Sequence, residues 1–334
     1  MNGLQLLIIF LSLAPTVIVA QDVHWSQFSD NPIFQNPGQA GNFKGDYRFI
    51  GNYRDQWRAV TVPFQTTSIS VDGRLTKLKN LGIGGLLFHD AVGDGKLQTL
   101  EIQINLNLPV YLTRDSSLVF RPGINVGINQ RQINTQLLTF DNQYNGVQYD
   151  ENLSTNENFS ANSRTNFSTG LGFVFDWTLN TRNKLNTGLG LFNLNRPDQG
   201  FLGAKIQRDI RTNFHARLDH KIDKNLFLLP AVNLSLQGKY KEFVLGSSVK
   251  YIMKEHLGQY RAVYAGIWYR TKDAGFISLG MDYQNWFLGV SYDLNFSKLT
   301  QASNARGGLE IAIRYIHQSL KPKKITHRIC PDYI

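Results

Sequence analysis

The sequence predicts an all-β protein, a transmembrane antiparallel β-barrel of about 14 strands. Three observations predict this fold. Apolar and polar residues alternate over segments of about ten residues, aromatic residues gather near the segment ends, and the residues between the apolar ones are small and polar. Only 18% of the 334 residues are charged, whereas 12% are aromatic. This composition suits strands joined by polar turns better than helices.

The alternation is clearest in segments 100–112, 167–179 and 286–296, where every second residue is apolar. In the third of these, Trp286 and Leu288 alternate with residues such as Gly289 and Ser291. Successive side chains of a strand point to opposite faces of the sheet. One face of each segment is therefore expected to meet lipid, and the other to line a lumen.

Fourteen segments follow this pattern, an even number, as bacterial barrels have. They are 47–57, 65–77, 81–90, 97–113, 117–131, 166–179, 183–194, 211–222, 226–240, 242–252, 258–271, 275–284, 286–298 and 307–317. A soluble β-sandwich would also alternate, but these segments are as long as tilted membrane-spanning strands, and barrel closure removes exposed edges. The aromatic residues expected to form girdles at the membrane interfaces are Tyr47, Trp57, Trp177, Tyr240, Tyr251, Tyr260, Trp268, Tyr283, Trp286 and Tyr315.

The connections between the predicted strands set an orientation. If residues 22–46 begin in the periplasm, the two longest connections, 132–165 and 195–210, lie outside the cell, and most turns at the other end are short. Long outer loops and short periplasmic turns are typical of outer-membrane barrels. Loop 132–165 is expected to be a flexible surface loop, with a binding loop or a lumen plug as the alternative.

The apolar run that ends at Ala20 predicts a secretory signal peptide over residues 1–20, with an uncleaved anchor as the alternative. The chain then divides into a periplasmic or mouth segment (21–46), the barrel (47–320) and a periplasmic tail (321–334). An exported chain does not meet nucleic acid, so we assign the net charge of +10 to loops and rims near anionic lipid or acidic partners. Cys330 is the only cysteine, so an intrachain disulfide is excluded.

The sequence contains no pattern that predicts catalysis. It lacks HExxH, CxxC, GxSxG and phosphate-loop motifs, and His215 and His220 lie on opposite faces of one predicted strand. We therefore predict no catalytic residue, no cofactor and no metal site, and the chain is expected not to be an enzyme.

The last predicted hairpin carries charged residues on its lumen face. Folding it about residues 302–303 would bring Asp293 and Asn295 opposite Glu310 and Arg314. We predict a polar network there, which would hold the barrel shut by internal salt bridges.

Motifs spread over the chain carry a family resemblance. In order they are Gln21-Asp22, Ser26-Gln27-Phe28, Asn31-Pro32, Asn36-Pro37-Gly38, Ala40-Gly41, Tyr53-Arg54-Asp55-Gln56-Trp57, Pro63-Phe64-Gln65-Thr66, Ser70, Asp72, Gly82, Gly84-Gly85, Asp90, Gly93, Asp273-Ala274, Gly289-Val290-Ser291-Tyr292-Asp293, Ser297, Leu299, Gly307-Gly308, Glu310-Ile311 and Cys330-Pro331. In this order and spacing the chain closely resembles the PorP/SprF family of the type IX secretion system of Bacteroidota. It departs from the family at Gly38, where Ala is more frequent, and slightly in the tail after Pro331.

The resemblance implies an outer-membrane barrel of the secretion and gliding machinery, without enzymatic activity. Implied partners are the type B C-terminal domain of a secreted surface adhesin, the translocon, the PorK/PorN ring, a periplasmic peptidoglycan-binding protein and outer-membrane lipid. The implied structural or partner-contact residues are Gln27, Asn31, Pro32, Asn36, Pro37, Gly41, Arg54, Asp55, Gln56, Trp57, Asp90, Gly93, Tyr292, Asp293, Gly308, Glu310, Arg314, Cys330 and Pro331.

The two Asn-Pro steps, Asn31-Pro32 and Asn36-Pro37, favour turns and predict an ordered segment at the periplasmic mouth; a plain lead-in to the first strand is the alternative. The alternative function is a passive channel for small hydrophobic or polar solutes. A lumen filled by the N-terminal segment or by loop 132–165 would favour secretion, and an open or ligand-filled lumen would favour transport.

Overall fold

The computed structural model describes residues 23–58, 62–93, 96–256, 259–296 and 306–319. The predicted signal peptide, the tail after residue 320, and Cys330 and Pro331 with it, lie outside these residues.

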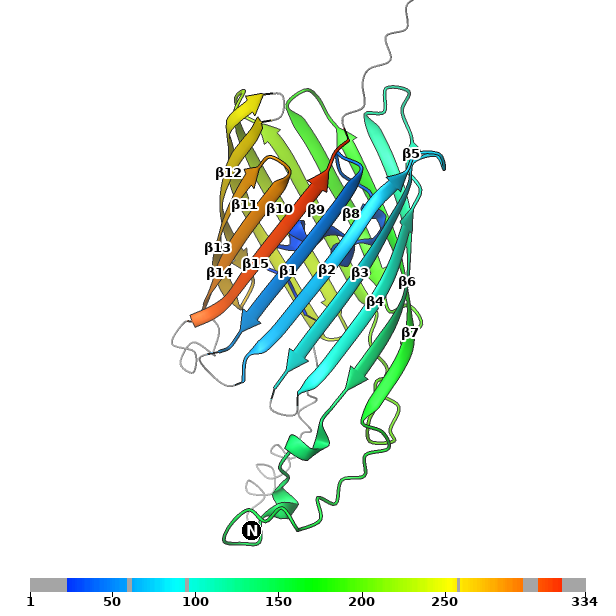
Figure 1. Cartoon of the computed structure of the whole chain (residues 1–334), viewed down its shortest axis with the longest axis vertical. Helices are drawn as coiled ribbons and strands as arrows, with labels where there is room; N and C mark the ends of the chain where they lie inside the picture. Colours follow the sequence, from blue (N-terminus) through cyan, green and yellow to red (C-terminus); the bar gives the residue numbers. More distant parts are fainter. Residues whose placement is uncertain (1–22, 59–61, 94–95, 257–258, 297–305, 320–334) are drawn as a thin grey trace, which may run out of the picture.

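The chain forms a closed antiparallel barrel (Figure 1). Its strands are β1 (Tyr47–Gln56), β2 (Phe64–Leu75), β3 (Leu81–Val92), β4 (Leu97–Asn107), β5 (Val110–Tyr111), β6 (Leu118–Gln132), β7 (Ser163–Thr178), β8 (Asn183–Phe192), β9 (Arg211–Lys221), β10 (Leu226–Gln237), β11 (Tyr240–His256), β12 (Gln259–Arg270), β13 (Ala274–Tyr283), β14 (Trp286–Asn295) and β15 (Arg306–His317). Each strand pairs with its neighbours in the sequence, except that β4 and β5 both pair with β6, and β1 pairs with β15 to close the barrel.

The wall has 14 strands, because β4 and β5 form one line along β6. The line is interrupted at Leu108 and Pro109, where proline has no N–H to continue the hydrogen-bond ladder. All fourteen predicted strands are present, and the predicted fold class is confirmed.

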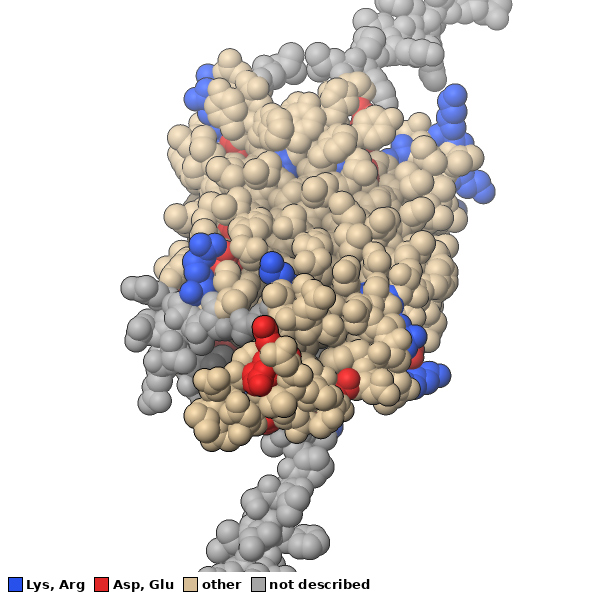
Figure 2. Space-filling view, turned by 60° about the horizontal axis from the view of Figure 1, so that its bottom comes forward, with Lys and Arg blue, Asp and Glu red and all other residues tan. Residues whose placement is uncertain are grey.

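The two faces of the wall differ as the alternation predicted. On β14, Leu288 and Val290 face outward and are 51% and 38% exposed, whereas Ser291 and Asp293 face inward and are buried. On the side of the wall visible in Figure 2, charged side chains are sparse in the middle and lie mainly toward the two ends. An apolar outer belt and a polar interior are the pattern of barrels that cross a membrane. In the described part of the chain, no helix combines the length and the apolar character needed for a membrane span.

The connections differ between the two ends of the barrel. At the lower end in Figure 1 lie the connections 133–162 and 193–210, and we call this the loop end. The other end, with the short connections 179–182, 222–225 and 284–285, is called the turn end. The predicted long and short connections are therefore confirmed.

The longest connection carries η3 (Thr135–Leu137) and η4 (Asp141–Gln143) and extends away from the barrel (Figure 1). The expected surface loop is confirmed, and the alternative that this loop fills the lumen is wrong. Its polar residues can be solvated outside the barrel, so it has no need of partners in the lumen.

Several predicted girdle residues face outward near the turn end. These are Tyr47, Trp177, Tyr251, Tyr283 and Trp286, all of them exposed. The prediction is wrong for Trp268, Tyr240 and Tyr260, which point into the lumen. The Trp268 ring packs edge-on against Phe28 at 5.4 Å, the Tyr240 hydroxyl donates to Glu242, and the Tyr260 ring lies 5.4 Å from the inward-facing Lys250. All three sit on the inward phase of their strands, so nearness to a strand end was not sufficient to place them at the lipid interface.

Residues 23–46 lie inside the barrel, and we call them the plug (Figure 1). They form three short helical turns, η1 (Phe28–Asp30), α2 (Pro32–Gln35) and η2 (Pro37–Gln39). The plug runs from the loop end, where Val23 lines a cavity among the loops, to the turn end, where the Asp46 amide donates to the His317 carbonyl. An ordered segment is confirmed, but it lies in the lumen rather than at its mouth. Its polar side chains find partners only on the inner face of the wall.

Candidate functional site

An ionic cluster is buried inside the wall near the loop end. The Arg54 guanidinium on β1 lies 2.8 Å from carboxylate oxygens of both Glu310 on β15 and Asp293 on β14. Arg270 on β12 lies 2.9 Å from the same Asp293 carboxylate and 3.5 Å from Glu242 on β11. Arg54 and Glu310 are fully buried. Five strands thus contribute to one charge network.

The start of the plug completes this network. The backbone amides of Ser26 and Gln27 each donate to one oxygen of Glu310, both at 2.7 Å. The Ser26 hydroxyl donates to Asp293 at 2.7 Å. Buried charges are tolerated only when paired and fully hydrogen-bonded. The plug therefore supplies donors that these two carboxylates need, and the cluster fixes the plug in return.

The network predicted for the last hairpin is present, but its register differs from the prediction. Glu310 pairs with Ser291, and Arg314 pairs with Phe287. The observed pairs are centred between residues 300 and 301 rather than at residues 302–303, and the register shifts once more between Tyr292 and Leu294. Asp293 and Glu310 are joined through Arg54 and through Ser26 of the plug, which each contact both carboxylates.

Arg314 lies further toward the turn end and binds the plug separately. Its guanidinium lies 2.8 Å from Asp30 of the plug and 3.4 Å from Asp282 on β13. Salt bridges therefore hold the plug to the wall at a second place.

The two Asn-Pro steps shape the middle of the plug. Pro32 and Pro37 occupy first helical positions, where a missing N–H costs no hydrogen bond. The Asn31 amide donates to Ser68 on β2 at 2.7 Å. The Asn36 side chain accepts from the Gly38 amide and donates to the Phe173 carbonyl on β7. Both asparagines are almost fully buried.

The plug ends in a tight turn against β2. Gly41 has φ of +69°, a left-handed conformation that favours glycine, and its amide donates to Asp72 at 2.7 Å. Arg48 on β1 donates to both oxygens of this carboxylate, at 2.9 Å to Oδ1 and at 2.7 Å to Oδ2, the oxygen that also accepts from Gly41.

Of the other predicted residues, Gln56 adjoins the ionic cluster, because its side-chain amide lies within hydrogen-bonding distance of the Arg54 guanidinium. Asp55, Gln56, Trp57, Asp90 and Gly93 lie at or near the loop end, on β1, on β3 or in the residues that follow them. Asp55 accepts from the Tyr53 hydroxyl, and Asp90 accepts from Thr66. Gly308 is buried beside Gln56. Tyr292 faces outward and is 43% exposed.

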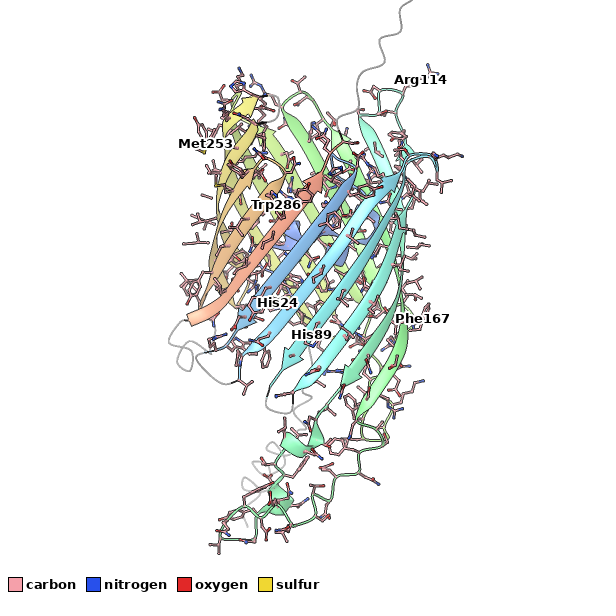
Figure 3. All side chains as sticks on the ribbon, in the orientation of Figure 1. His24, His89, Arg114, Phe167, Met253 and Trp286 are labelled. Carbon is pink, nitrogen blue, oxygen red and sulfur yellow. The ribbon has the colours of Figure 1, made fainter. Side chains whose placement is uncertain are left out.

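Several residues that join the plug to the wall were not among the predicted site residues. These are His24 of the plug and, on the wall, Arg48, Asp72, Glu242 and Arg270, of which only Asp72 belongs to the family motifs. Figure 3 places His24 within the barrel, where its ring lies 3.4 Å from Glu242. The usable signal was a charged residue on the inward phase of a predicted strand, which applies to Arg48, Asp72, Glu242 and Arg270.

The largest two of the cavities found around the plug in the described residues lie on its opposite sides. The loop-side cavity has a volume of about 770 Å³ and includes Trp57, Phe88, Arg131 and Lys239 in its lining. The turn-side cavity has a volume of about 200 Å³ and lies between Asp30 of the plug and the inner wall.

A closed antiparallel barrel with an apolar belt and a plugged lumen defines an integral membrane protein of the β-barrel class. Residues 17–315 match the family described as type IX secretion system membrane protein PorP/SprF. The chain belongs to this family, and family and fold together place it in the outer membrane as a secretion-system membrane component.

Solved structures show the same fold at low sequence identity. The toluene transporter TbuX of Ralstonia pickettii is 10% identical, with a TM-score of 0.52 over 86% of this chain and 93% of that chain. The toluene transporter TodX of Pseudomonas putida is 10% identical, with a TM-score of 0.53 over 88% of this chain and 94% of that chain. No curated protein sequence matches the chain significantly.

Proposed function

We propose that this barrel assists the export or surface anchoring of large adhesins that carry a type B C-terminal domain, as part of the secretion and gliding machinery. Family membership supports the secretion role. The proposal includes contacts with the translocon, with the PorK/PorN ring and with a periplasmic peptidoglycan-binding protein. It assigns no catalytic activity to the chain.

The observation that carries the proposal is the filled lumen. The plug crosses the barrel and is joined to the wall by the Arg54 cluster near the loop end and by the Gly41–Asp72 bond near the turn end. A lumen occupied in this way supports a role in docking other proteins over a role as an open pore. The passive channel remains the alternative, and the likeness to the two toluene transporters supports only a shared fold.

The proposed orientation puts the loop end outside the cell. The loop between β6 and β7 then presents apolar side chains at its tip, where Val147 is 84% exposed and Tyr144 is 57% exposed. Exposed apolar residues on a projecting loop are a common feature of protein contact sites. We assign the adhesin contact to this loop and the ring contact to the turn end.

The test is recovery of partners with the tagged protein from native outer membranes, identified by mass spectrometry. We expect an adhesin C-terminal domain and a ring component to copurify. The double variant Tyr144→Ser, Val147→Ser is expected to lose most of the adhesin and to keep the ring component. The recovered ring component then shows that the variant is folded and inserted.

The matched control is Leu112→Ser. It also replaces an exposed apolar residue by serine, but at the turn end, in the connection between β5 and β6. This control is expected to retain the adhesin. Recovery of neither an adhesin C-terminal domain nor a ring component with the unaltered protein would refute the proposed function.

A further inference from the structure

We propose that the turn-side cavity is a binding site for a carboxylate-bearing ligand with a small apolar body, and that Lys250 binds the carboxylate. The inference concerns the side of the plug opposite to the proposed adhesin contact. It does not depend on the proposed function.

Lys250 is a lumen-facing cation that forms no direct salt bridge within the described residues, although the charges of Asp282 and Asp219 act on it from a greater distance. Its ammonium lies 5.4 Å from the ring centroids of Tyr260 and Tyr264 and 5.7 Å from that of Phe227. Within the described residues, no carboxylate oxygen lies within 4.0 Å of it. Aromatic faces attract a cation, but they do not accept hydrogen bonds as a carboxylate does.

The other charges around this cavity are already paired. Arg217 binds Asp219 with an N–O distance of 2.8 Å, and Arg314 binds Asp30 at 2.8 Å. Asp282, whose charge also acts on Lys250, accepts from the Tyr264 hydroxyl at 2.5 Å and lies 3.4 Å from Arg314. Among the cations that line this cavity in the described residues, Lys250 is therefore the one that can still form a salt bridge with a ligand.

The shape of the cavity sets the size of the ligand. Its volume is about 200 Å³, and its walls include the apolar surfaces of Phe227, Leu229, Trp268 and Phe287. A dry cavity of roughly 150 Å³ is sufficient for benzene. The site therefore has room for one phenyl-sized group beside a carboxylate, which is the combination of apolar wall and single charged anchor that small-ligand sites use.

The position of the cavity in the barrel determines from which side of the membrane a ligand can enter. Its charged residues lie on the halves of β9, β11 and β15 that lead to the turn end, so in the proposed orientation the site serves the periplasm. Two sources supply the same chemistry there: a free small carboxylic acid, or the terminal carboxylate of a peptide that ends in an aromatic or aliphatic residue.

The test is isothermal titration calorimetry on the full-length protein in detergent, with 3-phenylpropionate as the probe. The uncharged amide of the same acid has nearly the same shape and is the matched ligand control. We expect the amide to bind at least tenfold more weakly than the acid, because it offers Lys250 no negative charge.

The protein variant is Lys250→Met, which keeps the aliphatic stem and removes the charge. The matched control is Lys241→Met on the outward face of the same strand. Lys250→Met is expected to weaken binding of the acid at least tenfold, and Lys241→Met to leave it unchanged. Equal affinity for acid and amide, unchanged affinity in Lys250→Met, or no binding of the acid would each overturn the proposal.

A second pair of ligands distinguishes the two sources. The dipeptide Ala-Phe, acetylated at its amino end, is titrated with a free carboxyl end and with an amidated one. Tighter binding of the free-carboxyl dipeptide than of 3-phenylpropionate assigns the site to protein C-termini. The reverse order assigns it to free acids. Both orders support a carboxylate site, provided that the amidated dipeptide binds more weakly than its free acid.

Discussion

Gly38 lies where the backbone of the plug comes close to the wall. A Cβ atom added there would lie 2.7 Å from the Arg121 carbonyl oxygen and 3.0 Å from Val174. Across the gap, a Cβ on Gly123 of β6 would lie 2.7 Å from the Gly38 Cα. Backbone meets backbone at this point, so side chains on either partner would force them apart. The departure from the family pattern at Gly38 therefore has a local structural reason.

The variant Gly38→Ala is expected to destabilise the folded protein by about 1–3 kcal/mol, the usual cost of overpacking a tight interior. The measurement is urea unfolding in detergent, followed by tryptophan fluorescence. Gly51→Ala on β1 is the matched control, because a Cβ there meets nothing within 4 Å. Equal unfolding free energies for the two variants would contradict the close approach.

Glu310 joins the plug to the wall, because its carboxylate accepts hydrogen bonds from plug amides and pairs with Arg54 of β1. The variant Glu310→Gln removes the negative charge from two backbone amides of the plug and from Arg54. Leaving a buried charge uncompensated costs up to about 3–5 kcal/mol. We expect a lower thermal unfolding midpoint by circular dichroism, together with faster proteolysis of the plug.

The matched control for this charge removal is Glu157→Gln in the exposed loop after β6. It is expected to leave the unfolding midpoint unchanged. A Glu310→Gln protein as stable as this control would mean that Arg54 is satisfied without Glu310.

The sequence was sufficient to predict which charged residues of the last hairpin face the lumen, because Glu310 and Arg314 share the inward phase of one strand. It was not sufficient to predict that Arg270 and Glu242 join them. Those residues come from strands β12 and β11, and only the closed wall and the position of Ser26 bring all of them to one place. A strand's period gives the direction of a side chain, but not its depth or its partners across a lumen.

At the scale of elements, the plug is the feature that separates a closed barrel from an open one. It has little regular structure, with helical turns of three or four residues, so its order comes from contacts with the wall. For the same reason its place could not be predicted from periodicity. The strands, whose alternation extends over ten or more residues, were found to within a few residues.

We expect the unaltered protein to give no stable conductance in planar lipid bilayers. Replacing residues 23–45 by a flexible Gly/Ser linker of the same length is expected to give stepwise ion conductance, because the lumen-filling contacts are lost while the connection to β1 is kept. A control with the loop segment 145–148 replaced in the same way should stay closed, since that loop lies outside the lumen.

The opposite result would favour the channel alternative. Steady conductance through the unaltered protein would show that solutes pass the plug, and the docking role would lose its main support. An unchanged, closed linker variant would show that side chains of the wall alone fill the lumen.

At the scale of the whole molecule, the composition follows from the barrel. The outward positions of the strands are apolar, the inward positions are polar and small, and the charged residues that remain gather at the two ends (Figure 2). Arg114, for example, lies in a turn at the turn end (Figure 3). The net charge of +10 thus belongs to surfaces that meet lipid headgroups, water or other proteins, and the middle belt stays uncharged.

A charged side chain in this apolar belt should destabilise the protein in a membrane. Leu279 lies in the middle of β13, faces outward and is 60% exposed, so in the membrane it meets the hydrocarbon core. The variant Leu279→Arg is expected to lower the free energy of unfolding from liposomes by about 2–4 kcal/mol, the cost of arginine near the bilayer midplane. Leu202→Arg in the connection between β8 and β9 is the matched control, because Leu202 is comparably exposed but lies at the loop end. The experiment is urea titration of both variants in liposomes. A cost for Leu202→Arg as large as that for Leu279→Arg would mean that the bilayer does not end where the charged rim begins.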